Sequence, residues 1–229
     1  MIGVFDSGVG GITAVREMRR LDKAVDIAFY PDRKNAPYGT KSRDELIPLV
    51  ERDIRILLNS GADCVLMACC TASTVYQFID CELLRLSIPI IDPTAKAAAS
   101  KTKNGNVAVL ATDATVRSGE FKRALSLSGV KNVAEISAQG LVLAIERGAR
   151  DGHVTKENES LLDRYIEEVR QSGADTLILG CTHFPHLEGE IAKRLPRVKL
   201  ISSSREGALE AIKKSRRRGN GKTIYMGKL

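Results

Sequence analysis

The segment SGADCVLMAC at residues 60–69 aligns without a gap on SGADTLILGC at residues 172–181, and this internal repeat decides the fold. Each copy reads as a helix end, a buried strand and a cysteine at the carboxyl end of that strand. The segments at residues 2–7 and 107–112 are also similar, at nearly the same separation. Each reads as a strand that runs into a loop with hydroxyl side chains. The chain is therefore predicted to hold two related lobes.

Short apolar runs alternate with amphipathic helical stretches around this repeat. We expect strands at residues 2–5, 25–30, 64–68, 88–91, 107–110, 133–136, 177–179 and 198–201. Continuous apolar strands joined by helices predict an α/β fold of two pseudo-symmetric lobes, each with a mostly parallel sheet flanked by helices. We place the first lobe at residues 1–93 plus 205–229 and the second at 94–204, with the break near Asp92 and Pro93.

Two helices have recognisable starts. Ser42 and Glu45 form a capping box ahead of an apolar stripe that continues to residue 58, and Pro48 is expected to kink that helix or delay its start. Thr155 is the expected N-cap of a second helix, which ends near residue 171.

The composition is that of a folded protein with a basic excess. The chain has 229 residues, of which 43% are apolar, and a net charge of +7. A basic run can bind nucleic acid or an anionic membrane. However, aromatic residues make up only 4% of the chain and Trp is absent, so stacking surfaces for nucleic acid are poorly supplied. We expect no nucleic-acid partner, and no apolar stretch reaches the ~18 residues of a membrane span. Much of the positive charge lies in Lys213, Lys214, Arg216, Arg217 and Arg218.

The five cysteines indicate a reducing compartment. Their number is odd, they form no C-x-x-C pair, and Asp6 interrupts the opening apolar residues, so we expect no signal peptide and a cytoplasmic protein. Cys64 and Cys81 read as buried small apolar residues. Although Cys181 is close to His183 and His186, no second cysteine lies at zinc spacing, so we expect no metal.

The chemistry is predicted to lie at the two cysteines that the repeat matches, Cys69 and Cys181. Ligands bind beyond the carboxyl ends of the strands in open α/β sheets. If the lobes face each other, the two thiols are opposed across an interlobe cleft. One thiolate could remove a proton from Cα while the other thiol donates one to the opposite face, which is racemisation without a cofactor. The alternative is that both are ordinary buried cysteines.

Other segments supply polar groups to the same cleft. Asp6 and Ser7 follow the first strand and are expected to point into the cleft, while the glycines after them allow close approach of a ligand. The Tyr38 hydroxyl and the Gly39 amide could reach a carboxylate, or could belong to a plain turn. His183 is placed to polarise the neighbouring thiol. Glu146 by itself reads as an exposed helix carboxylate.

Five segments in order carry a family resemblance: DSGVGG at 6–11, PYG at 37–39, ACCTAS at 68–73, ATVRS at 114–118 and GCTHFP at 180–185. Together they resemble the glutamate racemases of the aspartate/glutamate racemase superfamily. The resemblance implies an isomerase that needs no cofactor and interconverts L- and D-glutamate for peptidoglycan synthesis. It implies an acid/base pair of Cys69 and Cys181, assisted by Asp6, Glu146 and His183. The implied substrate-binding residues are Asp6, Ser7, Tyr38, Gly39, Cys70, Thr71, Thr182 and His183.

The chain departs from that family at two places. Cys70 stands where the family usually has Asn, and Ser202 begins a serine run where the family tends to have Asp. Two other functions therefore stay open: racemisation of another small acid such as aspartate, and a weakly active or non-catalytic binding protein on the same fold. The resemblance favours glutamate over aspartate as the substrate, since the aspartate branch of the superfamily typically has Thr-Glu where this chain has Thr182 and His183. A homodimer is also left open.

Overall fold

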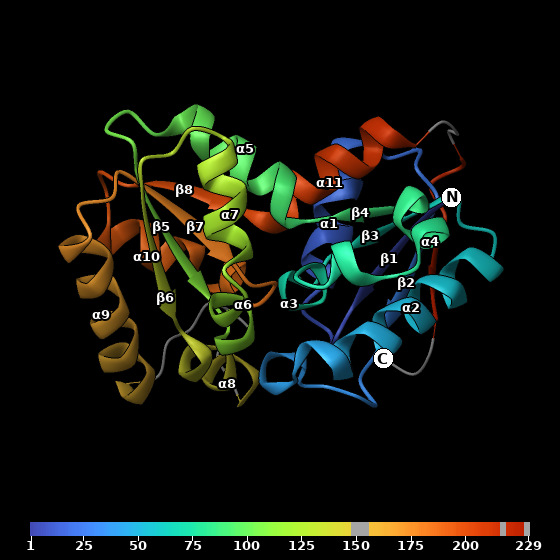
Figure 1. Cartoon of the computed structure of the whole chain (residues 1–229), viewed down its shortest axis with the longest axis horizontal. Helices are drawn as coiled ribbons and strands as arrows, with labels where there is room; N and C mark the ends of the chain where they lie inside the picture. The colour runs from blue at the N-terminus through green and yellow to red at the C-terminus, as the bar shows by residue number, and fades with distance from the viewer. Residues whose placement is uncertain (148–155, 216–218, 227–229) are drawn as a thin grey trace.

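Two parallel sheets lie side by side, as Figure 1 shows. The computed structural model describes residues 1–147, 156–215 and 219–226, without the side chains of residues 146, 147, 156 and 157. The first sheet has the strand order β4-β3-β1-β2-β9, and all its neighbours pair in parallel. Its strands are β1 (Ile2–Asp6), β2 (Ile27–Pro31), β3 (Cys64–Met67), β4 (Ser87–Pro89) and β9 (Thr223–Tyr225).

The second sheet repeats the arrangement of the first. Its order is β6-β5-β7-β8, which read from the other edge matches β4-β3-β1-β2 strand for strand. The register also matches, because Ile2 pairs with Cys64 in one sheet and Val107 pairs with Thr176 in the other. The predicted two-lobe α/β fold is therefore confirmed. The strands are β5 (Asn106–Ala111), β6 (Asn132–Ser137), β7 (Thr176–Gly180) and β8 (Lys199–Ser202).

Helices cover both faces of each sheet, and one hydrophobic cluster fills each of the four interfaces. The first sheet lies between α1 (Ile12–Leu21) and α11 (Ser203–Lys214) on one face and α2 (Arg43–Asn59) and α4 (Cys81–Leu86) on the other. The second lies between α5 (Ile91–Lys101) and α7 (Glu120–Leu127) on one face and α8 (Gln139–Arg147), α9 (Lys156–Gln171) and α10 (Glu188–Arg194) on the other. Burial on both faces explains why the strands read as continuous apolar runs.

The start of α2 follows the predicted capping box. The Ser42 hydroxyl accepts the Glu45 N–H at 3.3 Å, and the Glu45 carboxylate accepts the Ser42 N–H at 2.8 Å. Pro48 lies inside α2, which begins at Arg43, so the expectation that this proline delays the helix is wrong. The reciprocal cap fixes the first turn before the proline is reached. Thr155 lies outside the described residues.

The connection between the two sheets is helical from its start. Strand β4 ends at Pro89 and α5 begins at Ile91, so residue 91 is not in a strand as predicted. Pro93 lies in the first turn of α5, where a missing N–H costs no helical hydrogen bond. The exposed position of Cys81 at the start of α4 likewise contradicts its interpretation as a buried residue, whereas Cys64 is buried.

The end of the described chain returns to the first sheet. Helix α11 packs against both α1 and α5, and β9 then pairs with β2 at the sheet edge. This three-residue strand was not predicted from the sequence. The exact boundaries of the two lobes stay a prediction.

Candidate active site

A small cavity lies where the carboxyl ends of the two sheets face each other. Cys69 follows β3, Cys181 follows β7, and both line the cavity. The free space measures about 30 Å³, which holds a water or two and is too small for an amino acid. A substrate can therefore enter only when residues that line the cavity move apart. The cavity lies in the interlobe position that the sequence predicted for the active site.

Cys69 is the N-cap of α3 (Cys70–Ser73). Its sulfur accepts the backbone N–H of Ala72 at 3.5 Å and lies 3.6 Å from the Ser7 hydroxyl, to which the thiol donates. Burial, with a smaller contribution from the charge of Asp6, raises the pKa of the Cys69 thiol to about 12. In this closed arrangement Cys69 therefore carries its proton and is suited to act as an acid.

Cys181 has a different neighbour. The strand β7 ends at Gly180, and the chain then makes a 3₁₀ turn, η3 (Phe184–Leu187), in place of an α-helix. The Cys181 sulfur lies 3.5 Å from Nδ1 of His183, and both side chains are buried. This contact places His183 beside the thiol that the sequence expects it to polarise.

Asp6 connects the two lobes beside the cavity. Its carboxylate accepts the Gly8 N–H at 3.0 Å and the Thr182 hydroxyl at 3.2 Å. Complete burial raises the pKa of Asp6, while the charge of His183 and the bonds from Gly8 and Thr182 act in the opposite direction. Asp6 does not itself line the cavity among the described residues, but it holds a residue that does.

Two of the glycines that follow Asp6 allow close packing, Gly10 against the second lobe and Gly11 within the first lobe. A Cβ on Gly10 would collide with Thr182, and one on Gly11 would collide with the side chain of Asp6. The prediction that these glycines admit a ligand is therefore replaced by close packing of the protein against itself. Gly8 is the exception, because it lines the cavity and a Cβ there would meet nothing within 4 Å.

A cluster of three hydroxyls joins the lobes on another side of the cavity. Thr71 Oγ1 lies 2.9 Å from Thr112 Oγ1 and 3.1 Å from Thr115 Oγ1, and the latter two are 2.9 Å apart. Thr71 belongs to the first lobe, whereas the other two follow β5 in the second. Thr112 also lines the cavity. Its position after β5, equivalent to that of Ser7 after β1, was the available signal for its role.

Cys70 is turned toward the protein interior. It is only 2% exposed and packs among the apolar residues between α5 and the second sheet. Burial raises the pKa of its thiol well above the ordinary value. Position 70 borders the cavity, yet its side chain is a poor donor to any anion there.

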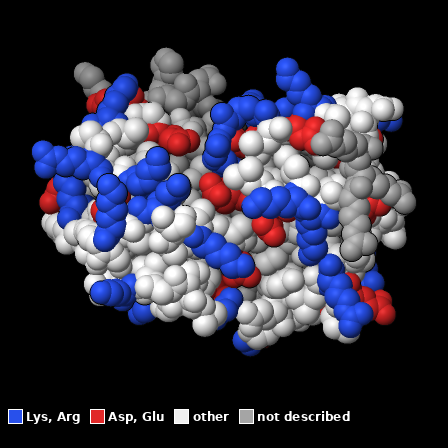
Figure 2. All heavy atoms as spheres, turned by 90° about the horizontal axis from the view of Figure 1, so that it is seen from above, with Lys and Arg blue, Asp and Glu red and all other residues white. Residues whose placement is uncertain are grey.

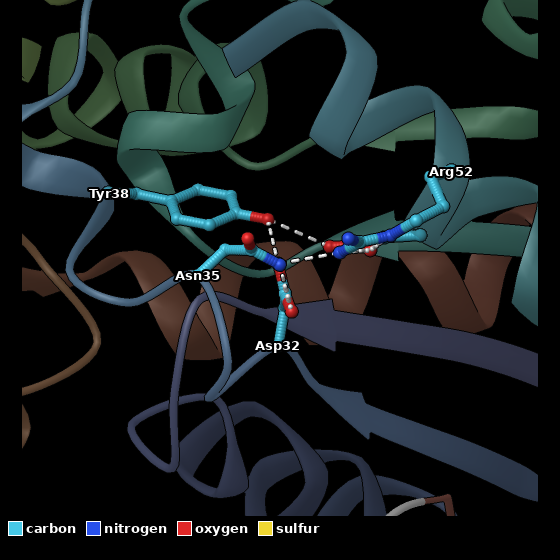
Figure 3. Close-up of polar contacts among 5 residues, drawn as sticks. Asp32, Asn35, Tyr38 and Arg52 are labelled. Carbon is cyan, nitrogen blue, oxygen red and sulfur yellow. Dashed lines mark hydrogen bonds and ion pairs between the residues drawn. The ribbon is translucent and has the colours of Figure 1, made fainter. Parts of the chain in front are cut away.

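Tyr38 lines the cavity with its ring and directs its hydroxyl elsewhere (Figure 3). The hydroxyl lies 2.7 Å from an oxygen of Asp32 and 2.9 Å from one of Asp53. Arg52 pairs with both carboxylates, at 2.6 and 2.5 Å, and the Asn35 amide donates to Asp32. The expectation that this hydroxyl reaches a substrate carboxylate is therefore wrong, because two buried carboxylates already compete for its single proton.

This network anchors the turn that precedes Gly39. Asp32 and Asp53 are 1% and 0% exposed, so neither charge is solvated and the Arg52 guanidinium supplies the compensation. Burial, together with the nearby charge of Asp32, raises the pKa of Asp53 to about 6, against the lowering effect of Arg52. Asp53 interrupts the apolar stripe of α2 three residues after Val50, and that interruption was the sequence signal for a buried acid.

The structure gathers most of the predicted site residues around one cavity. Glu146 lies in α8, but its side chain is outside the described residues. In the described part of the chain, no group of three or more His, Cys, Asp or Glu residues is arranged to hold a metal ion. Two further cavity residues, Gln139 and Val142, were not predicted from the sequence. The lining residues that were predicted are Ser7, Tyr38, Gly39, Cys69, Cys70, Thr71, Cys181, Thr182 and His183.

The basic side chains are spread over the surface. Figure 2 shows Lys and Arg over one face of the molecule with Asp and Glu among them. Lys214 near the end of α11 donates to the Ser87 carbonyl at 3.1 Å, and residues 216–218 lie outside the described part. None of the helices that the structure describes has the length and apolar character needed to cross a membrane.

Comparisons with known proteins point in one direction. A family model described as Asp/Glu/Hydantoin racemase matches residues 17–211. The glutamate racemase of Desulforudis audaxviator is 38% identical over 87% of this chain and 73% of its own length. The crystal structure of a glutamate racemase isoform from Bacillus anthracis superposes with a TM-score of 0.82 and 30% identity, over 98% of this chain and 86% of that one. The structure of glutamate racemase from Francisella tularensis in complex with D-glutamate gives a TM-score of 0.82 and 26% identity over the same shares.

Proposed function

The chain belongs to the Asp/Glu/hydantoin racemase family, and we propose that it is an isomerase that interconverts L- and D-glutamate. The observation that carries the proposal is the pair of thiols, Cys69 and Cys181, at the ends of equivalent strands on a shared cavity. Racemisation at one carbon requires an acid and a base on opposite faces, and two lobes related by a repeat provide that arrangement.

The reaction consists of two proton transfers. One sulfur, as the thiolate, takes the α-proton and becomes a thiol, and the electron pair stays on the planar α-carbon. The other thiol donates its proton to the opposite face of that carbon and becomes the thiolate. The proton that Cys69 retains suits it to the donor role in one direction, while the imidazole of His183 can take up the proton of Cys181. The roles exchange in the reverse direction.

Polar groups at the rim of the cavity are proposed to hold the substrate. Ser7, Gly39, Thr71 and Thr182 line the cavity that the thiols share, and they offer the hydroxyls of Ser7 and Thr71 and backbone N–H groups, whereas the Thr182 hydroxyl gives its proton to Asp6. Carboxylates are bound in proteins by such O–H and N–H donors. Asp6 would orient Thr182, and Glu146 is retained as an assisting residue from the family resemblance. A reaction made only of proton transfers calls for no cofactor.

The proposed setting is the cytoplasm, where D-glutamate would enter peptidoglycan synthesis. The two reacting sulfurs have to stay reduced, and all five cysteines are free thiols in the structure. The homodimer stays a prediction, which sedimentation of the purified protein would test.

The test is circular dichroism of L-glutamate incubated with the purified protein and no added cofactor. We expect the signal to decay to zero, and in deuterium oxide we expect deuterium at Cα of the product. The control is Cys81→Ala, which removes an exposed thiol away from the cavity and should behave as the wild type. Decay with aspartate and not with glutamate would assign the other acidic substrate. No decay and no deuterium with either acid would leave a binding protein on the racemase fold and overturn the proposal.

A further inference from the structure

Gln139 enters the cavity from the second lobe. It is the first residue of α8, directly after the loop that follows β6, and it lines the cavity together with Val142. Its position is opposite Gly39 of the first lobe, because a Cβ placed on Gly39 would lie 2.7 Å from the Gln139 Oε1 atom. The same point is 3.2 Å from Cβ of Thr112. The Gln139 amide therefore lies on the same wall of the cavity as Thr112, whose hydroxyl contacts the hydroxyl of Thr71.

The oxygen of the Gln139 amide has no hydrogen-bond partner among the described residues. This Oε1 atom is also buried. A buried carbonyl oxygen without a donor is unfavourable, and native proteins usually avoid it. Turning the amide about its last bond breaks no hydrogen bond of this oxygen and moves the NH₂ group to the place that the oxygen occupies. The amide oxygen therefore has no hydrogen bond to lose when a molecule binds in the cavity.

Among the side chains that the structure describes, the wall beside Gln139 also carries hydroxyl donors. Thr71 and Thr112 have hydroxyls there, while the buried Cys70 thiol on the same cavity is only a weak donor. The buried carboxylate of Asp6, by contrast, lies with Thr182 and His183. An amino acid carries an ammonium group and carboxylates, and a carboxylate is favoured where hydroxyl and amide donors gather away from the Asp6 carboxylate.

We propose that the Gln139 side-chain amide is a substrate-binding group, which donates from Nε2 to a carboxylate of the bound amino acid. This inference rests on the proposed racemase function and adds to it a contact from the second lobe. Because Gln139 lies against Gly39 across the lobe boundary, the contact is complete only when the lobes are closed on the substrate. Gln139 thereby couples recognition of the carboxylate to closure.

The test compares Gln139→Ala and Gln139→Glu with the wild type, in both directions and with D-glutamate binding followed by calorimetry. We expect Gln139→Ala to raise KM and the dissociation constant about tenfold, as the loss of one hydrogen bond to a charged group predicts, with kcat changed less than about threefold. Gln139→Glu has nearly the same shape but repels an anion, so it should raise both constants further. Gln77→Glu, the same exchange at an exposed position of the first lobe, is the matched control and should change neither.

The outcomes separate this inference from the proposed function. Wild-type racemisation with unchanged constants in Gln139→Ala would overturn the role of Gln139 and leave the function standing. Constants for Gln139→Glu equal to or below the wild-type values would also overturn it, since a carboxylate cannot donate. A wild type that binds D-glutamate but does not racemise it would overturn the function alone, and the two dissociation constants would still decide the role of Gln139.

Discussion

Cys69 and Cys181 end equivalent strands of two sheets with the same register, yet their sulfurs have different partners. Cys69 begins a helix, and its sulfur receives a backbone N–H from Ala72 and contacts the Ser7 hydroxyl. Cys181 is followed by a 3₁₀ turn and has the imidazole of His183 at 3.5 Å. The repeat thus fixes where the thiols are, and the residues that follow each strand fix how each one handles its proton.

This difference is compatible with a reaction that runs equally well both ways. L- and D-glutamate have the same free energy in water, so kcat/KM must be equal in the two directions for the wild type and for every variant. Unequal partners at the two thiols can therefore make kcat differ between the two directions only if KM differs by the same factor. The comparison between the two sites has to be tested through the separate constants and through isotope exchange.

The largest expected effect comes from removing either thiol. Cys69→Ala and Cys181→Ala should each lower kcat/KM by on the order of 10⁴-fold, because inversion needs an acid and a base on opposite faces. Each variant keeps one thiol, so each should still exchange the α-proton of one enantiomer with solvent deuterium without inverting it. NMR of the α-proton follows both processes.

The two variants should act on opposite enantiomers, since the remaining thiol faces one side of the carbon only. Exchange of the same enantiomer by both would mean that the thiols are not opposed. Wild-type rates in either variant would remove the two-base assignment altogether.

Changing the partner of one thiol should have a smaller effect. His183→Asn removes the imidazole beside Cys181 and should lower kcat/KM by about 10²-fold, at the low end for one proton-transfer partner. The loss should be equal in both directions, but its division between kcat and KM should differ between L- and D-glutamate. His186→Asn makes the same exchange three residues later, outside the cavity lining, and is the control. Equal losses in the two variants would indicate a structural effect of the turn.

The sequence predicts the parts of this site that depend on strand order. The repeat is enough to place Cys69 and Cys181 at facing carboxyl ends, and Asp6 with them, because parallel strands of equal register end at the same edge. The Tyr38 hydroxyl was misassigned, because its partners Asp32 and Asp53 come from a loop and a helix that no local pattern connects.

Gln139 was missed for a related reason. Its importance depends on how the lobes meet, since its amide lies against Gly39 of the other lobe. Strand β9 was missed because it is only three residues long, with a partly polar sequence at a sheet edge. Features that follow from strand order were thus more accessible to sequence reasoning than side-chain contacts between segments far apart in the chain.

A third prediction concerns Asp53, which belongs to the buried network with Asp32, Tyr38 and Arg52 in the first lobe. Asp53 has a folded-state pKa of about 6, above its ordinary value of 3.8. Proton binding therefore favours the folded state, and this contribution is complete below pH 3.8 and lost as the pH rises through 6. Asp53→Asn removes the titration. Relative to the wild type, the free energy of unfolding of the variant should rise by on the order of 2 kcal/mol from pH 4 to pH 7.

Urea unfolding of both proteins at several pH values measures this difference, and the comparison cancels the constant cost of losing the pair with Arg52. If the difference in the free energy of unfolding between the two proteins does not change between pH 4 and pH 7, the pKa of Asp53 is not raised in the folded state. Racemase activity at pH 7 should persist in the variant, because Asp53 lies outside the described cavity lining.

The smallest expected effect concerns two cavity residues from different lobes, Cys70 and Gln139. Cys70 of the first lobe offers only a weak donor, while Gln139 of the second lobe offers an amide. Cys70→Asn adds an amide to the first lobe with little change in volume. If the Gln139 amide already donates to the carboxylate, this added amide is partly redundant and should raise kcat/KM for glutamate only about threefold.

In the Gln139→Ala background the same exchange should restore more, about tenfold, because one hydrogen bond to a charged group is regained. Steady-state kinetics of the four proteins give the coupling between the two positions. Equal effects in both backgrounds would mean that the positions act independently, and a fall in glutamate activity in both would mean that the Cys70 wall, packed against Ser203 and α5, does not accept an amide.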